Sequence, residues 1–174
     1  MNDKDKINKI VIINGYNETG KDEFIKQSNS FFTNIFNYST IDYYKKMAVE
    51  YFNWNPDKKD EKSRVLLSSL KKLHKEYDDS PFKTTCEYIE QIKICPNDWI
   101  IFIHSREPEE IKRLKERYNA ITLLIDRDSA IPANNSSDMS VKMTKYDYTV
   151  NNNGTIDDLK KQTKIFYDWM IVNG

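Results

Sequence analysis

The sequence is poor in the residue types that mark several classes of protein. Its 174 residues include only two cysteines, two histidines, four glycines and five prolines. Cys86 and Cys95 lie nine residues apart, without a second cysteine pair or clustered histidines nearby. This spacing favours neither a zinc site nor a disulfide framework, and we expect two reduced thiols that are buried or half-buried.

Net charge and long apolar runs are also lacking. The 27 Lys and Arg residues equal the 27 Asp and Glu residues, so the basic footprint of a protein that binds extended nucleic acid is absent. The longest apolar run, Trp99–Ile103, is far too short to cross a bilayer. Asp3 and Asp5 interrupt the start, and no signal peptide is expected. We therefore expect a cytoplasmic protein with one domain, without a membrane partner.

The most informative segment comes directly after a short apolar run, Ile10–Ile13, and before a helix-like stretch. Its eight residues are Gly15-Tyr16-Asn17-Glu18-Thr19-Gly20-Lys21-Asp22. A buried strand, then Gly-x-x-x-x-Gly-Lys, then a helix is the order of a phosphate-binding loop for nucleoside triphosphates. The alternative is an ordinary turn between strand and helix that happens to carry a lysine.

The residue types of this loop suit a triphosphate. Gly15 and Gly20 allow backbone conformations in which successive N–H groups turn inward and form an anion-binding nest. The following helix would point its positive end at the same place. Lys21 would add a point charge at the β- and γ-phosphates, so all eight loop residues are candidates for ATP binding.

Two loop residues depart from the common pattern. Asp22 stands where Ser or Thr usually binds Mg²⁺, and a carboxylate can hold this hard cation directly or through water. Asp22 is therefore the candidate metal ligand. Glu18 adds a negative charge to a loop built for anions, so either it points to solvent or it weakens the site.

Periodicity along the chain predicts an α/β fold with a parallel sheet. The predicted buried strands are Ile10–Ile13, Trp99–Ile103 and Ile121–Ile125, and the weaker strand candidates are Tyr38–Ile41 and Tyr148–Val150. The predicted helices are Lys21 to about Phe36, Asp42–Phe52, Glu61–Tyr77, Pro81–Ile94, Pro108–Tyr118 and Thr155–Ile171. Thr155 is expected to cap the last helix together with Asp158, in an acidic variant of the capping box.

The spacing of these elements predicts two additions to the sheet. Residues 42–96 hold three helices and no strand, which is too much for one crossover, so they form a helical insertion. Residues 128–145 are rich in Asn, Ser and Asp, and they are either a lid over the donor nucleotide or an ordinary surface loop. The core then comprises residues 7–41, 97–127 and 146–174.

With these residues in view, the chain resembles the nucleoside monophosphate kinase branch of the P-loop kinases. It is most similar to bacteriophage-type deoxynucleoside monophosphate kinases and to animal phosphomevalonate kinase, which also favour Gly-Lys-Asp. Further similar blocks are Ser39–Asp42, Arg64–Lys71, Ile103–Ile111, Leu124–Arg127 and Tyr146–Thr155. The resemblance implies a three-layer P-loop kinase fold, with a five-stranded parallel sheet, helices on both faces, a helical acceptor-binding insertion and a short lid.

The resemblance also implies roles for individual residues on the donor side. Lys21, Arg106 and Arg127 would be catalytic, and Asn153 would join the loop in binding the nucleotide. Arg106 follows the strand Trp99–Ile103, where it could clamp a phosphate bidentately. The alternatives are an ion pair of Arg106 with Glu109 or Glu110, and one of Arg127 with Asp126 or Asp128.

On the acceptor side, the resemblance points to Asp42, Arg64 and Lys71 as substrate-binding residues. Arg64 and Lys71 share one face of a helix by spacing, so both could meet an acceptor phosphate. Asp42 could instead be the N-cap of the helix that follows it.

The sequence departs from its relatives at the end of the strand Trp99–Ile103. Many P-loop enzymes keep an Asp there, whereas this chain has His104 and Ser105. The carboxylate behind the metal is therefore unassigned, and Glu107 is a candidate by proximity alone.

Two functional hypotheses follow from these residues. The first is an ATP- and Mg²⁺-dependent kinase, a monomer or homodimer, that converts a (deoxy)nucleoside monophosphate, or another small phosphorylated acceptor, to the diphosphate. The second is a P-loop protein that binds nucleotide without turnover and acts as a sensor or interaction module.

Overall fold

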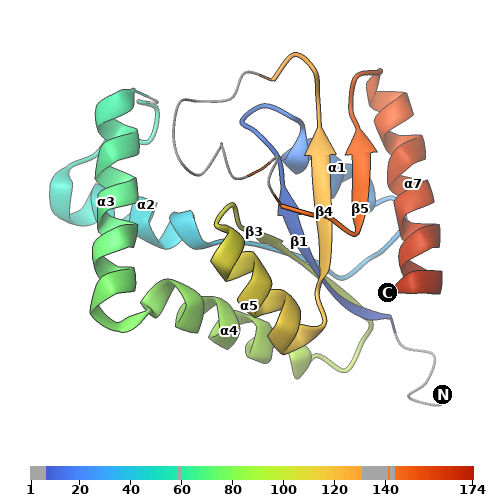
Figure 1. The fold of residues 1–174 in the computed structure, drawn as a ribbon, viewed down its shortest axis with the longest axis horizontal. Helices are drawn as coiled ribbons and strands as arrows, with labels where there is room; N and C mark the ends of the chain where they lie inside the picture. The colour runs from blue at the N-terminus through green and yellow to red at the C-terminus, as the bar shows by residue number, and fades with distance from the viewer. Residues whose placement is uncertain (1–6, 59, 131–140, 142–143) are drawn as a thin grey trace. The chain divides into compact units, whose positions relative to one another are not determined.

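The fold is a five-stranded parallel β-sheet with helices on both faces (Figure 1). It is described here from a computed structural model, which covers residues 7–58, 60–130, 141 and 144–174. The strands are β1 (Asn8–Asn14), β2 (Ile35–Ser39), β3 (Trp99–His104), β4 (Ile121–Asp126) and β5 (Tyr148–Asn151). The helices are α1 (Lys21–Ser28), α2 (Thr40–Phe52), α3 (Glu61–Asp78), α4 (Ser80–Lys93), α5 (Pro108–Tyr118) and α7 (Ile156–Asn173).

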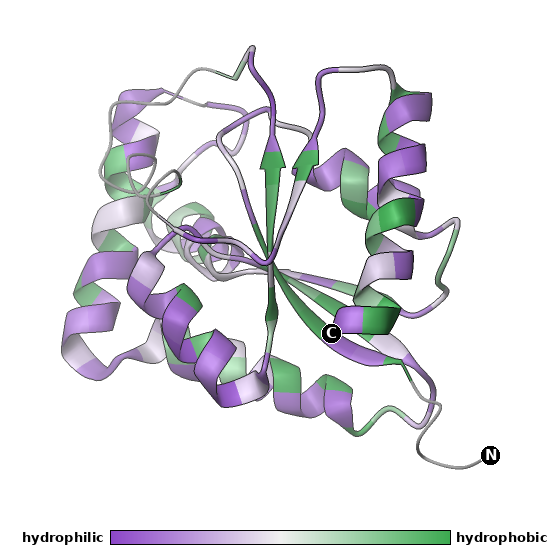
Figure 2. Cartoon of the chain, turned by 45° about the vertical axis from the view of Figure 1, so that its right-hand side comes forward, coloured by the Kyte–Doolittle hydropathy of each residue, from purple (hydrophilic) through white to green (hydrophobic). Residues whose placement is uncertain are grey.

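The strand order β2-β3-β1-β4-β5 places β1 at the centre of the sheet. β1 pairs with β3 from Asn8 opposite Trp99 to Ile13 opposite His104, and with β4 from Val11 opposite Ile121. These central strands are covered on both faces, which explains why they are continuous apolar runs, coloured green in Figure 2. All five carboxyl ends lie at one edge, the edge at which parallel sheets bind ligands.

Aromatic side chains join the sheet to the helices of one face. Phe24 of α1 lies edge-on to Phe102 of β3 and Phe166 of α7, with ring centroids 6.2 and 5.7 Å apart. α1 and α7 therefore pack on each other and on the same face of the sheet. On the opposite face, α5 contacts β1 and β4 and buries Ile111 and Leu114.

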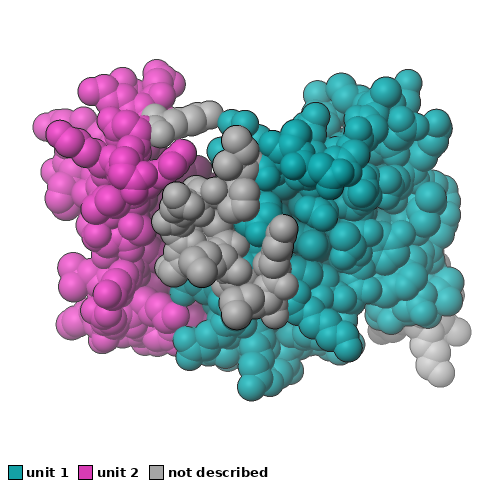
Figure 3. Space-filling model, turned by 45° about the horizontal axis from the view of Figure 1, so that its top comes forward, with its two compact units in different colours: residues 1–37, 95–174 teal, residues 38–94 magenta. Residues whose placement is uncertain are grey.

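The chain divides into two compact units, residues 1–37 with 95–174 and residues 38–94 (Figure 3). The second unit contains α2, α3 and α4, so three helices and no strand separate β2 from β3, as the sequence predicted. Within this unit the Tyr44 hydroxyl lies 3.2 Å from His74 Nδ1, and the Tyr38 ring stacks on Tyr88 at 4.5 Å. Whether the unit binds an acceptor remains a prediction.

Two predicted boundaries in the first quarter of the chain were wrong. The predicted helix from Lys21 to about Phe36 ends at Ser28, because Phe31 and Phe32 turn back to pack against Tyr167 of α7. The carbonyl oxygen of Asn34 then accepts a hydrogen bond from the Ile100 N–H, which starts the pairing of β2 with β3.

The strand predicted over Tyr38–Ile41 begins and ends earlier, at Ile35 and Ser39. Thr40 and Ile41 are already helical. Asp42 therefore lies inside the first turn of α2, and the N-cap position belongs to Ser39, so the reading of Asp42 as the N-cap was also wrong.

The start and the N-cap of the C-terminal helix were predicted correctly, and the helix continues to Asn173, beyond the predicted end at Ile171. The Thr155 hydroxyl accepts a hydrogen bond from the Asp158 N–H, and the Asp158 carboxylate accepts one from the Thr155 N–H. Hydrogen bonds from Thr155 lower the pKa of Asp158 to about 2. Most of the predicted lid, residues 128–145, lies outside the described residues. Among those described, no helix combines the length and apolar character needed to span a membrane.

Asp147 joins β4 to the segment that enters β5. Its carboxylate accepts hydrogen bonds from the Thr122 N–H at 2.9 Å and hydroxyl at 2.8 Å, and from Lys115 at 2.5 and 2.7 Å. Burial alone would raise the pKa of Asp147, but the hydrogen bonds from Lys115 and Thr122 outweigh it and hold the pKa below its usual value. The folded state therefore favours the ionised carboxylate.

Replacing this carboxylate by an amide should destabilise the fold in a pH-dependent way. We expect Asp147→Asn to lower the free energy of unfolding by about 1–2 kcal/mol at pH 7, since the side chain is 33% exposed and partly screened. Because the folded pKa is depressed, the contribution is complete above pH ~4 and is lost as pH falls through the folded pKa. Denaturant unfolding from pH 7 to pH 3 should show the difference between variant and wild type narrowing.

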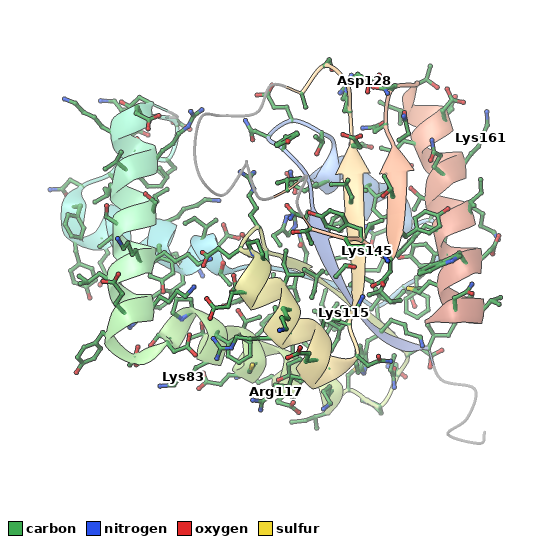
Figure 4. The ribbon with its side chains drawn as sticks, viewed as in Figure 1. Lys83, Lys115, Arg117, Asp128, Lys145 and Lys161 are labelled. Atoms are coloured by element: carbon green, nitrogen blue, oxygen red, sulfur yellow. The ribbon has the colours of Figure 1, made fainter. Side chains whose placement is uncertain are left out.

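Asp128→Asn is the matched control, because Asp128 is exposed just beyond the carboxyl end of β4 (Figure 4). It should unfold like the wild type at each pH. An equal loss in both variants, or a loss in Asp147→Asn that does not change with pH, would contradict the role of the Asp147 carboxylate.

Candidate functional site

The loop Gly15–Asp22 connects the central strand to the first helix at the carboxyl edge of the sheet (Figure 1). β1 ends at Asn14, which lies opposite Leu124 of β4, while Ile13 lies opposite His104 of β3. α1 begins at Lys21, and the Phe24 N–H donates to the Gly20 carbonyl at 2.9 Å. The positive N-terminus of α1 is therefore directed at the loop, as the sequence predicted.

The two loop glycines have backbone conformations that favour glycine. Gly15 has a φ of +146° and Gly20 a φ of +93°. A Cβ on Gly15 would lie 2.4 Å from the Ile125 carbonyl oxygen, and one on Gly20 would lie 2.3 Å from Asn152 Nδ2. The loop backbone thus lies closely against the ends of β4 and β5, and side chains at either position would displace it.

Hydrogen bonds from buried side chains hold the loop in this shape. Asn152, directly after β5, donates from Nδ2 to the Thr19 carbonyl at 2.8 Å. Asn14 accepts from the Gly15 N–H at 2.7 Å and donates to the Tyr146 hydroxyl at 2.8 Å. The Thr19 hydroxyl donates to the Tyr16 carbonyl at 3.1 Å. The sequence analysis missed Asn14 and Asn152, although both polar residues directly follow or end buried strands, a pattern that could have identified them.

The ammonium group of Lys21 lies at the loop itself. It donates hydrogen bonds to the carbonyl oxygens of Gly15 at 2.8 Å and Tyr16 at 2.5 Å. A positive charge is thereby fixed beside the backbone that would surround a phosphate. A stray surface lysine would not reach back over the loop in this way, so the geometry favours the phosphate-binding interpretation.

The two unusual acidic residues of the loop are both exposed. Glu18 has a φ of +62°, in the left-handed region that is strained for a residue with a side chain. The Asp22 side chain is 95% exposed on the first turn of α1, and its Oδ1 lies 4.0 Å from His104 Nε2. His104 therefore lies beside the predicted metal ligand.

The loop fits a nucleoside triphosphate better than it fits a complete metal site. Its two glycines have positive φ and its Lys21 ammonium lies beside the backbone, the features that a phosphate-binding loop requires. No cluster of three or more His, Cys, Asp or Glu side chains suited to a metal occurs in the described part of the chain. Asp22 and His104 would thus supply only two protein ligands. The remaining coordination positions of Mg²⁺ are commonly filled by substrate phosphates and water.

The other donor-side candidates follow the ends of neighbouring strands. Arg106 is half-buried after β3, and Arg127 is exposed directly after β4. Arg127 makes no ion pair with any described residue, so neither alternative partner, Asp126 or Asp128, is found. Asn153 is exposed, and its Oδ1 accepts a hydrogen bond from the Asp128 N–H at 2.9 Å. The topology thus brings Arg106, Arg127 and Asn153 to the same edge of the sheet as the loop.

A buried carboxylate, which the sequence suggested only as an alternative ion-pair partner of Arg106, contacts the turn that follows β3. Glu110, in the first turn of α5, accepts a hydrogen bond from the Ser105 hydroxyl at 2.8 Å. Both residues are buried. The bond ties the turn that carries Arg106 to the helix that follows it. Glu110 is thus a carboxylate in contact with Ser105, while the suggested role of Glu107 remains a prediction.

The acceptor-side candidates all lie in the second unit and are described within it. Asp42 forms an ion pair with Lys45 at 2.7 Å, one turn along α2. Arg64 lies in the first turn of α3 and pairs with Glu61 at 3.6 Å, while Lys71 lies two turns further along the same helix. The predicted helical placement of Arg64 and Lys71 is thus seen, and their role in binding remains a prediction.

Comparison with known proteins places the chain by its fold. Neither a protein-family model nor a curated protein matches the sequence. Shikimate kinase from Aquifex aeolicus is 16% identical, with a TM-score of 0.52 over 95% of this chain and 99% of that one. A sugar kinase from Janibacter sp. and the tunicamycin resistance protein from Deinococcus radiodurans are each 10% identical, over 92% of this chain and 95% of theirs. Their TM-scores are 0.54 and 0.51. The chain therefore has the P-loop kinase fold.

Proposed function

We propose that this protein transfers the γ-phosphoryl group of ATP to a small phosphorylated acceptor, a (deoxy)nucleoside monophosphate, and forms the diphosphate. The observation that carries the proposal is the loop Gly15–Asp22, with its two positive-φ glycines and the Lys21 ammonium held beside its backbone. Kinases of small substrates, among them shikimate kinase and a sugar kinase, share the fold and support the reaction class.

The chain's own residues would act by positioning and by neutralising charge. The loop N–H groups and the N-terminus of α1 would hold the triphosphate, while Lys21 would exchange its bonds to Gly15 and Tyr16 for phosphate oxygens. Arg106 and Arg127 would meet the charge of the transferring group. Asp22 would hold Mg²⁺, which neutralises the phosphates when bound.

The acceptor assignment follows from the resemblance to nucleoside monophosphate kinases. Asp42, Arg64 and Lys71 come from α2 and α3 of the second unit, the part of the chain that in such kinases would receive the acceptor. A guanidinium and an ammonium group suit an acceptor that already carries a phosphate. We further propose that the two units form one cytoplasmic kinase domain that acts as a monomer or homodimer.

Two observations favour the rival function, a nucleotide-binding module without turnover. Glu18 places a carboxylate in the loop, and β3 ends in His104 and is followed by Ser105 where many P-loop enzymes have an Asp. Binding and turnover must therefore be measured separately.

Removal of the Lys21 ammonium should weaken donor binding without unfolding the protein. We expect Lys21→Ala to weaken binding of Mg²⁺·ATP at least tenfold by calorimetry, because a charge-assisted hydrogen bond to phosphate contributes about 1.5–3 kcal/mol. Lys26→Ala is the control, since Lys26 lies on the same helix with a side chain 77% exposed. If both variants bind Mg²⁺·ATP saturably with equal affinity, the assigned role of Lys21 is wrong. If the wild type shows no saturable binding of Mg²⁺·ATP, the assignment of the donor site is wrong.

The charge of Glu18 should oppose the triphosphate if its side chain faces the site. Glu18→Gln should then tighten ATP binding up to about tenfold at low salt, and the gain should shrink as ionic strength rises. Glu116→Gln on α5 makes the same charge change at an exposed residue and should leave the affinity unchanged. Equal affinities in both variants would mean that Glu18 does not oppose the phosphates.

Enzyme and binding module differ most clearly at Arg106. Arg106→Lys keeps the charge but loses the planar fork, so turnover should fall about tenfold or more while ATP binding changes little. Arg127→Lys should act in the same direction. Mass spectrometry of reactions with ATP and each common nucleoside monophosphate measures the diphosphate formed. Clear ATP binding with no diphosphate from any acceptor would establish the binding module instead.

A further inference from the structure

The chain has only two histidines, and one of them lies at the base of the phosphate-binding loop. His104 is the last residue of β3 and lies opposite Ile13 of β1, two residues before Gly15. Its side chain is 17% exposed, whereas the Asp22 side chain is 95% exposed. His104 Nε2 lies 4.0 Å from Asp22 Oδ1.

These two side chains come from the two elements that flank a bound metal in a P-loop. Asp22 directly follows the loop lysine, where a hydroxyl would otherwise bind the ion, and His104 ends the strand beside β1. Two ligands in adjacent positions of one octahedral ion lie about 3 Å apart, from bond lengths near 2.1 Å. The exposed Asp22 side chain needs to move only about 1 Å toward His104 to meet this spacing.

The nitrogen donor changes which ion the pair prefers. Mg²⁺ favours oxygen ligands, whereas an imidazole nitrogen suits first-row transition ions. A site with one carboxylate and one imidazole therefore discriminates against Mg²⁺, in favour of Mn²⁺ or Co²⁺, more strongly than a site with two carboxylates would. An ion pair between a protonated His104 and Asp22 is the competing explanation of the contact, and it predicts no metal–nitrogen bond.

We propose that His104 and Asp22 together bind the metal of the nucleotide complex and give the protein a preference for Mn²⁺ or Co²⁺ over Mg²⁺. This inference rests on the proposed function, because phosphate oxygens of ATP and water complete the coordination. With two protein ligands, Mn²⁺ binds weakly alone and tightly together with ATP.

Pulsed electron paramagnetic resonance on the intact protein with Mn²⁺·ATP tests the coordination directly. A histidine ligand gives a ¹⁴N coupling to Mn²⁺, and labelling the protein with ¹⁵N-histidine replaces it with a ¹⁵N coupling, which separates imidazole from adenine nitrogen. The coupling should persist in His74→Gln, whose imidazole lies beside Tyr44 in the second unit, and should vanish in His104→Gln.

Calorimetry then measures the preference, with each metal in excess so that all ATP is complexed. The wild type should bind Mn²⁺·ATP about tenfold or more tightly than Mg²⁺·ATP, and His104→Asp should bring this ratio toward one. Thermal unfolding identifies any variant that fails to fold, and the ¹⁵N-histidine measurement needs no variant at all.

These measurements distinguish a failure of the proposed function from a failure of metal binding by His104. If the wild type binds no metal·ATP complex, the proposed function is wrong. If it binds Mn²⁺·ATP with no histidine coupling, or with a Mn²⁺ preference that survives in His104→Asp, the donor site stands and the role of His104 in metal binding is wrong.

Discussion

The close approach of the loop backbone to the carboxyl ends of β4 and β5 is the constraint on which the site depends. Gly15 lies against the Ile125 carbonyl and Gly20 against the Asn152 amide. A Cβ atom at either glycine would clash with these groups. The Asn152 bond to the Thr19 carbonyl then fixes the middle of the loop. Because these contacts come from the ends of buried strands, the shape of the loop follows from its packing against the sheet.

The same edge of the sheet explains why residues far apart in the sequence meet. The parallel register places His104 beside Ile13 and Leu124 beside Asn14, so the turns after β3 and β4 begin next to the loop. Arg106 and Arg127 follow strands whose buried residues are largely apolar, with Thr122 as the buried polar exception in β4. The fold thus brings two arginines to the edge of the sheet that holds the loop, while the chain as a whole carries no net charge.

Sequence reasoning succeeded where a single physical signal was strong. The apolar runs of β1, β3 and β4, the glycine and lysine spacing, and the capping box of α7 each identify their element locally. It failed where tertiary packing overrides local pattern: α1 stops at Ser28 because Phe31 and Phe32 pack against Tyr167. Likewise the sequence did not single out Asn152, whose buried side chain binds the loop only because the chain turns inward after β5; the role of Asn153 stays a prediction.

The hydrogen bonds of Asn14 show that one N–H group of the loop already has a partner within the protein. The Gly15 N–H donates to Asn14, Asn14 donates to Tyr146, and Tyr146 donates to the Val141 carbonyl. Burial raises the pKa of the Tyr146 phenol, so it stays protonated and keeps donating at neutral pH. Every proton in this relay is directed away from the loop. The Gly15 N–H is therefore already used within the protein, and the proposed phosphate would have to be bound by the amides that follow it.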